Sequence, residues 1–157
     1  MSERIRLLVL DVDGVLTDGR LYFGADGEAL KAFHVRDGHG IKALLQAGVT
    51  VAVVSGRSSP AVARRCAELG IRDLEQGCGD KAAAFNRLIA KLGVTAAESA
   101  CLVDDTPDLG LMAAVGHAFA VADAHPEVRA RAQRVTQSVG GAGAVREVCD
   151  WLLAQAP

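Results

Sequence analysis

The alternation of short apolar runs with longer Ala- and Leu-rich stretches is the feature that most constrains the fold of this chain. Apolar runs at residues 5–10, 49–54, 100–103 and 118–121 have the length and composition of strands buried on both faces. Candidate helices between and after them cover residues 38–47, 59–69, 80–92, 107–114, 126–132 and 143–154. This order predicts an α/β, Rossmann-like fold with a central parallel sheet and helices on both faces.

One stretch departs from the alternation. Residues 20–23 and 29–35 resemble strands, and they flank Gly24-Ala25-Asp26-Gly27. Because Asp-Gly between two strand-like runs favours a tight turn, we predict a projecting β-hairpin at about residues 20–34. No remaining segment is long enough for a separate cap domain. We therefore expect one domain over residues 1–157, with a glycine-rich C-terminal tail at about 138–157.

Composition narrows the class of protein. Half of the residues are hydrophobic and the formal net charge is -2, which favours a folded globular chain and argues against nucleic-acid or membrane-surface binding. No apolar run approaches the ~20 residues that span a bilayer, and no segment resembles a secretory signal. The four cysteines lack metal-site spacing, which fits a reducing compartment. We therefore expect a soluble cytoplasmic protein.

The strongest chemical signal is a pair of carboxylates, Asp11 and Asp13, at the end of the first apolar run. In open α/β sheets, ligands gather at the carboxyl ends of the strands. A hard divalent cation would compensate two carboxylates there, and one of them could then attack phosphorus while the other moves a proton. The alternative is that both residues only end the strand and start a turn.

A second motif, Ser55-Gly56-Arg57, ends the strand predicted at 49–54. A hydroxyl and a glycine amide offer two donors to a phosphate oxygen, and the arginine can add a bidentate contact to an anion. An ordinary strand-to-helix turn, in which Ser55 or Ser58 caps the helix, would explain the same residues.

Lys81 stands at a predicted helix start, where the helix dipole disfavours a cation. A lysine placed against that preference is a candidate for binding an anion. The alternative is a solvated lysine.

A further acidic cluster, Asp104, Asp105 and Asp108, follows the run at 100–103. In a parallel sheet it lies at the same edge as Asp11 and can complete a metal site. Alternatively, Asp105 or Thr106 caps a helix with Pro107 in its first turn. The four motifs taken together supply a nucleophile, a phosphate donor, a cation and a metal cluster, which favours phosphoryl chemistry.

The four motifs, in this order, resemble the haloacid dehalogenase phosphatase superfamily from Leu7 to about Leu152. Three further stretches resemble one branch, the phosphatases of 3-deoxy-D-manno-octulosonate 8-phosphate, which supply an acidic sugar to bacterial lipopolysaccharide. They are DVDGVLTDG at 11–19, FHVRDGHGI at 33–41 and GGAGAVRE at 140–147. The resemblance implies a magnesium-dependent phosphatase that hydrolyses this sugar phosphate through an aspartyl-phosphate intermediate.

The resemblance also implies roles for the acidic residues. Asp11 would be the nucleophile and a ligand of Mg²⁺, and Asp13 would be the general acid and base and a metal ligand through its backbone carbonyl. Asp104 would be the remaining protein ligand. Asp105 would be an outer-shell ligand of the metal, and Asp108 would orient the acidic cluster or Lys81.

Five other residues would bind the substrate by the same resemblance. Ser55, Gly56 and Lys81 would hold the phosphate, with Ser55 standing where the superfamily has threonine. Arg57 would favour a sugar that carries a carboxylate. Arg146, in the glycine-rich tail, is a candidate substrate contact or a solvated arginine at a helix start.

Members of the branch form homotetramers in which subunits cap one another. By resemblance, the hairpin would help to assemble them and the tail would reach a neighbour's active site. One position departs from the pattern, because Val103 stands where the superfamily has glycine before the two aspartates. Two alternatives stay open: a phosphatase for a nine-carbon acidic sugar phosphate, and a catalytically weakened binding or scaffolding subunit.

Overall fold

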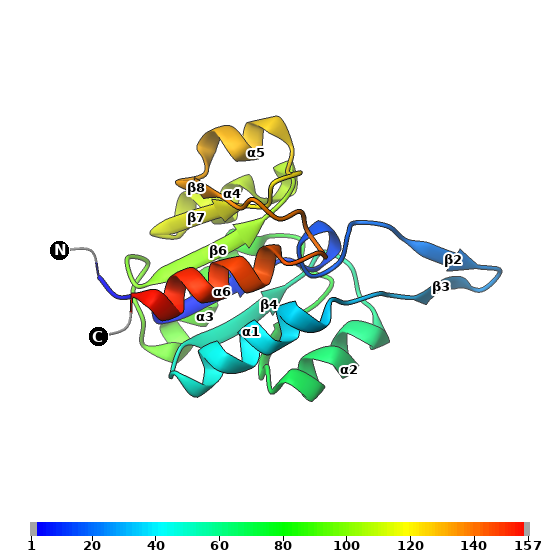
Figure 1. Ribbon diagram of the computed structural model, residues 1–157, viewed down its shortest axis with the longest axis horizontal. Coiled ribbons are helices and arrows are strands. Elements are labelled where there is room, and N and C mark those ends of the chain that lie inside the picture. Colours follow the sequence, from blue (N-terminus) through cyan, green and yellow to red (C-terminus); the bar gives the residue numbers. More distant parts are fainter. Residues whose placement is uncertain (1–2, 156–157) are drawn as a thin grey trace.

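The computed structural model describes residues 3–155, and their central feature is a six-stranded parallel sheet (Figure 1). Its strand order is β5-β4-β1-β6-β7-β8, and every neighbouring pair is parallel. The strands are β1 (Leu7–Leu10), β4 (Thr50–Val54), β5 (Asp73–Glu75), β6 (Ser99–Val103), β7 (His117–Ala120) and β8 (Arg134–Val135). The predicted fold class is thus confirmed.

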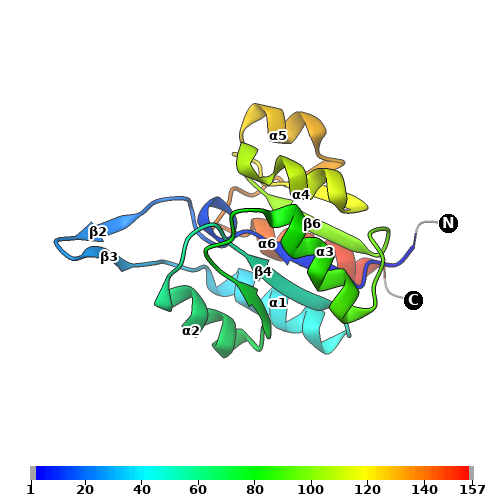
Figure 2. The same ribbon diagram turned by 180° about the vertical axis from the view of Figure 1, so that it is seen from behind.

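Helices cover both faces of the sheet. Helices α1, α2 and α6 lie on the face turned toward the viewer in Figure 1, and α3 and α4 lie on the opposite face, seen in Figure 2. The helices are α1 (Val35–Gln46), α2 (Pro60–Leu69), α3 (Lys81–Leu92), α4 (Leu109–Ala114), α5 (Pro126–Arg131) and α6 (Ala144–Ala154). Among the residues described, no helix is both long enough and apolar enough to cross a membrane.

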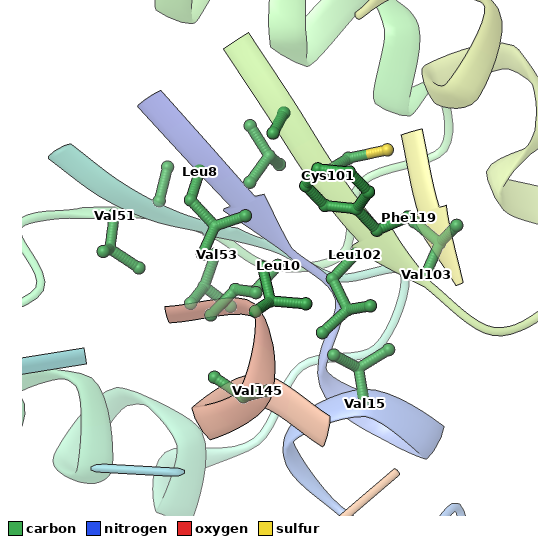
Figure 3. Close-up of a cluster of buried hydrophobic side chains, with 14 of the residues drawn as sticks. Leu8, Leu10, Val15, Val51, Val53, Cys101, Leu102, Val103, Phe119 and Val145 are labelled. Atoms are coloured by element: carbon green, nitrogen blue, oxygen red, sulfur yellow. The ribbon is translucent and has the colours of Figure 1, made fainter. Parts of the chain in front are cut away.

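The core lies between the sheet and these two helical layers. All four residues of β1 are fully buried, because helices shield both of its faces. Figure 3 shows Leu10 and Val53 of neighbouring strands on the same side of the sheet as Val145 of α6. Each such side chain contributes about 1.5–3 kcal/mol when it is removed from water. This tightly packed centre fixes where the strands end, and therefore where the chemical motifs lie.

The hairpin projects from the end of the sheet that lies opposite the last turn of α6 (Figures 1 and 2). It consists of β2 (Tyr22–Gly24) and β3 (Gly27–Leu30), joined by the two-residue turn Ala25-Asp26. The second strand stops at Leu30, five residues before the predicted end. Helix α1 starts at Val35, earlier than predicted, because His34 caps it by accepting a hydrogen bond at Nδ1 from the Arg36 amide.

Two strands were not predicted from the sequence. Strand β5 has the sequence Asp-Leu-Glu, and β8 contains only Arg134 and Val135. Both lie at edges of the sheet, where partly exposed positions tolerate charged residues and the apolar pattern weakens. The candidate helix at 107–114 divides into a 3₁₀ turn, η2 (Thr106–Asp108), and α4.

Candidate active site

A cavity of about 310 Å³ opens at the carboxyl ends of β4, β1 and β6, which are neighbours in the sheet. Adjacent parallel strands bring their following loops together, so three motifs that lie far apart in the sequence meet there. The lining residues are Asp11, Asp13, Ser55, Gly56, Arg57, Cys78, Gly79, Lys81, Asp104, Asp105, Pro107 and Asp108. Nine of the ten candidate site residues from the sequence are in this set; Arg146 is the exception.

Three carboxylates converge at the centre of the cavity. Asp11, Asp104 and Asp108 each place a carboxylate oxygen within 4.8 Å of the others. Lys81 Nζ donates hydrogen bonds to Asp11 Oδ1 at 2.9 Å and to Asp108 Oδ1 at 2.5 Å. The lysine side chain is only 10% exposed, so it is a buried partner of the acids rather than a solvated residue.

The electrostatics of this cluster are dominated by excess negative charge. Burial, the charge of Asp11 and a hydrogen bond with it raise the pKa of Asp104 to about 8. Burial and the charge of Asp108 also raise the pKa of Asp11, against the opposing effect of Lys81. Burial opposes the charge of Lys81, but Asp11 and Asp108 outweigh it and raise the pKa of the ammonium group. Three carboxylates therefore face one ammonium group.

This donor set fits a hard divalent cation. Carboxylate oxygens are the ligands that Mg²⁺ prefers, and two positive charges would balance the two negative charges that Lys81 leaves uncompensated. The close packing of the Asp104 carboxylate against the loop after β1 also supports a metal site here. Gly14 has φ of +89°, and a Cβ there would lie 1.8 Å from Asp104 Oδ2. Only glycine lets the Asp104 carboxylate approach the Asp11 loop this closely.

The loop after β1 is held by hydrogen bonds that the sequence did not reveal. It forms an irregular helical turn, η1 (Val12–Leu16), and the buried Thr17 accepts hydrogen bonds at Oγ1 from the amides of Gly14 and Gly19, both at 3.2 Å. The glycine-rich tail packs on the same loop of its own chain, where the Gly141 amide donates to the Val15 carbonyl at 3.0 Å. Figure 1 shows this tail beside η1.

The loop after β4 forms the second wall of the cavity. Ser55 is 2% exposed, and its Oγ accepts a hydrogen bond from the Arg57 amide at 3.3 Å. Its carbonyl accepts one from the Cys78 amide at 2.9 Å, which ties this loop to the segment that leads into Lys81. The motif 55–57 and Lys81 are therefore parts of one connected wall.

Asp13 has partners that sequence reasoning missed. Lys31 Nζ, from the base of the hairpin, donates to Asp13 Oδ1 at 2.7 Å and lies 3.2 Å from Glu28 Oε2. Arg57 is 3.3 Å from the same Glu28 oxygen and 3.9 Å from Asp13 Oδ2. The one available signal in the sequence was the pair of charged residues Glu28 and Lys31, three apart at the start of a strand-like run, and such a pair is ordinarily interpreted as exposed to solvent.

Other predicted positions have simpler surroundings. Asp105 caps η2 by accepting a hydrogen bond from the Thr106 amide at 2.7 Å, and it also lines the cavity. Arg146 does not line the cavity; its Nε donates to Asp150 at 3.0 Å along α6. Val103 pairs with Ala120 in the sheet and is fully buried. The valine thus extends β6, and Asp104 still reaches the other two acids.

A parallel sheet with aspartates at the end of its central strand, a buried lysine and an acidic cluster on the neighbouring loop defines a class of hydrolase. The haloacid dehalogenase-like hydrolase family matches residues 73–148. The chain belongs to this family, as its relatives also show.

The 3-deoxy-D-manno-octulosonate 8-phosphate phosphatase KdsC of Escherichia coli K12 is 52% identical to the chain over 152 residues, which cover 97% of the chain and 81% of KdsC. The KdsC of Yersinia pestis is 48% identical over the same shares of the two chains.

Solved structures agree with these relatives. The cobalt-bound deoxy-D-mannose-octulosonate 8-phosphate phosphatase of Haemophilus influenzae has a TM-score of 0.94 at 48% identity, over 96% of this chain and 88% of that one. The Moraxella catarrhalis enzyme, solved with magnesium ion, phosphate ion and KDO, has a TM-score of 0.92 at 42% identity, over 96% and 86%. At 48% and 42% sequence identity, both structures are similar to this chain in sequence as well as in fold.

Proposed function

We propose that this chain is a magnesium-dependent phosphatase that hydrolyses 3-deoxy-D-manno-octulosonate 8-phosphate to the free sugar acid and phosphate. The observation that carries the proposal is the convergence of Asp11, Asp104 and Asp108 around the buried ammonium group of Lys81. The chemistry of KdsC, a relative with 52% identity, supports the choice of substrate.

Asp11 is the proposed nucleophile. Its carboxylate attacks phosphorus, the bond between phosphorus and the sugar oxygen breaks, and Asp13 gives a proton to the departing alkoxide. The product of this step is an aspartyl-phosphate on Asp11. Asp13 then takes a proton from water as the water attacks phosphorus, which releases phosphate and restores the Asp11 carboxylate.

Four residues of the cavity wall are proposed to hold the substrate. The Ser55 hydroxyl, the Gly56 amide and Lys81 surround the phosphate, since they line the same cavity as Asp11. Asp108 orients Lys81 through the 2.5 Å contact. Arg57 provides a positive charge at the cavity edge for the sugar carboxylate.

Magnesium is the proposed metal, with Asp11, Asp104 and the backbone carbonyl of Asp13 as ligands and Asp105 in support. When bound, it supplies positive charge that offsets the repulsion between the Asp11 carboxylate and a phosphate dianion. The missing side chain of Gly14 leaves room for the Asp104 carboxylate at this position.

Assembly into a homotetramer is a separate part of the proposal. Apolar side chains of the hairpin are exposed: Phe23 is 64% and Leu30 52% exposed. An apolar surface of this kind is typical of an interface between subunits. Arg146 would contact substrate only if a neighbouring subunit brings its tail to the cavity. A cytoplasmic location is also proposed, supported by the four cysteines, which are all free thiols.

A phosphate-release assay tests the activity. The purified chain should release phosphate from 3-deoxy-D-manno-octulosonate 8-phosphate with Mg²⁺ and stop when a chelator is added. A nine-carbon acidic sugar phosphate serves as the competing substrate, and faster turnover of it would replace the proposed substrate. No release from either compound in a folded, metal-replete sample would favour a binding or scaffolding subunit.

A further inference from the structure

Lys31 is the most deeply buried charge on the hairpin. Its side chain is 1% exposed, whereas its neighbour Leu30 is 52% exposed. An ammonium group removed from water is costly unless carboxylates compensate it. Lys31 has two such partners, Asp13 at 2.7 Å and Glu28 at 3.2 Å. The chain therefore turns a hairpin lysine inward, toward the cavity.

The four charged groups close into a ring of alternating sign. Lys31 and Arg57 each lie between Asp13 and Glu28, so the ring joins the base of the hairpin to two loops of the cavity. Burial works against the charge of Glu28, but hydrogen bonds from Lys31 and Arg57 outweigh it and hold its pKa below the usual range. Glu28 thus remains an anion that fixes both cations.

The ring bears directly on the proposed acid and base. Among residues 3–155, Lys31 is the sole hydrogen-bond donor to the Asp13 carboxylate, because the Arg57 contact of 3.9 Å is too long for a hydrogen bond. The Asp13 side chain can rotate about two bonds, and its proton transfer requires one orientation toward the leaving oxygen. Lys31 is placed to set this orientation, because it donates the hydrogen bond to Asp13 Oδ1.

We propose that Lys31 is a positioning residue for Asp13, and that the base of the hairpin is part of the active site. This inference rests on the proposed function. Lys31 holds the Asp13 carboxyl at the cavity edge, so that as the phosphorus–oxygen bond breaks, the Asp13 proton passes to the leaving oxygen. The alternative is that the ion pair only anchors the hairpin to the rest of the chain.

The dependence of rate on the leaving group separates the two possibilities. Phenyl phosphate and 4-nitrophenyl phosphate have similar shapes, but phenolate is much the more basic leaving group and needs a proton more. The measurement is kcat/KM for both substrates with Mg²⁺, since it reports steps up to transfer of the phosphoryl group. We expect Lys31→Met to lower kcat/KM for phenyl phosphate at least ~10-fold more than for 4-nitrophenyl phosphate, a part of the ~10²–10⁴-fold contribution of a general acid.

Two further variants make the test decisive. In a background of Asp13→Asn, adding Lys31→Met should leave the ratio between the two substrates unchanged, and this double variant leaves no ammonium–carboxylate pair half broken at Asp13. Lys91→Met is the matched control, because Lys91 pairs with Asp73 at 2.8 Å on the exposed surface of α3. It should leave the ratio at the native value.

A uniform loss on both substrates in Lys31→Met, or a further change of the ratio in the double variant, would overturn the positioning role. Phosphate release from 3-deoxy-D-manno-octulosonate 8-phosphate by the native enzyme tests the proposed function itself. The ratio in the variants tests Lys31, so the two failures are distinguishable.

Discussion

Replacing Asp104 with asparagine should stabilise the metal-free protein and remove its response to magnesium. Burial and neighbouring carboxylates raise the pKa of Asp104 from 3.8 to about 8. Because the folded state holds this proton more tightly than the unfolded chain, ionisation penalises folding increasingly as the pH rises from about 4 to about 8. The penalty is absent at lower pH and complete above this range.

The magnitude follows from the shift. A difference of about 4 pH units gives an upper limit of about 6 kcal/mol at 1.36 kcal/mol per unit. Asp104 is partly exposed, so screening by water reduces the expected gain in unfolding free energy for Asp104→Asn to ~2 kcal/mol at pH 8. Magnesium should stabilise the native protein by ~2.7 kcal/mol at one hundred times its dissociation constant, and the variant far less.

Denaturant unfolding at pH 8, with a chelator or with Mg²⁺, measures both effects. Asp80→Asn is the matched control, because Asp80 is exposed, does not line the cavity, and caps α3, which asparagine does as well as aspartate. Its unfolding free energy should change by no more than ~0.5 kcal/mol. An Asp104→Asn protein that is less stable than the native one without metal, or that gains equally from Mg²⁺, would refute this account of the acidic cluster.

Three other predictions concern the site and the assembly. Asp11→Asn should abolish phosphate release with an unchanged circular dichroism spectrum, and retained turnover in a metal-replete sample would remove Asp11 from the nucleophile role. Gly14→Ala should lower the affinity for Mg²⁺ at least tenfold by calorimetry, because its Cβ would lie 1.8 Å from an Asp104 oxygen and φ is +89°. Phe23→Ser, at a side chain that is 64% exposed, should shift the protein to smaller species in light scattering, whereas a monomeric native protein would contradict the proposed tetramer.

The glycine-rich tail shows where local pattern and tertiary contact diverge. The sequence showed only a glycine-rich stretch, and the resemblance implied that it reaches a neighbouring subunit, which stays a prediction. Within one chain, Gly140 and Gly141 pack on the loop that follows β1. A Cβ on Gly140 would lie 1.8 Å from the Gly14 carbonyl oxygen. Glycine is therefore required for close backbone contact there, and sequence alone does not distinguish that requirement from flexibility.

Asp37 is another residue whose part became visible only in the folded chain. It is 2% exposed in α1, and its Oδ1 accepts a hydrogen bond from the Arg146 amide at the start of α6 at 2.9 Å. This contact joins residues 109 positions apart. The motif at 33–41 contributed to the resemblance, but no local signal indicated that its aspartate caps a distant helix.

The sequence by itself determined the parallel sheet, the projecting hairpin and the family. The apolar run of each central strand, and the aspartates that follow β1 and β6, can be recognised from short stretches of sequence. Since parallel strands end at one edge, the sequence also predicted that Asp11, Asp104 and Lys81 would meet, and the structure brings them together. Their catalytic roles stay predictions. Only the tertiary structure decided that Lys31 holds Asp13 and that the edge strands β5 and β8 form, because these depend on contacts between distant residues that local preference does not encode.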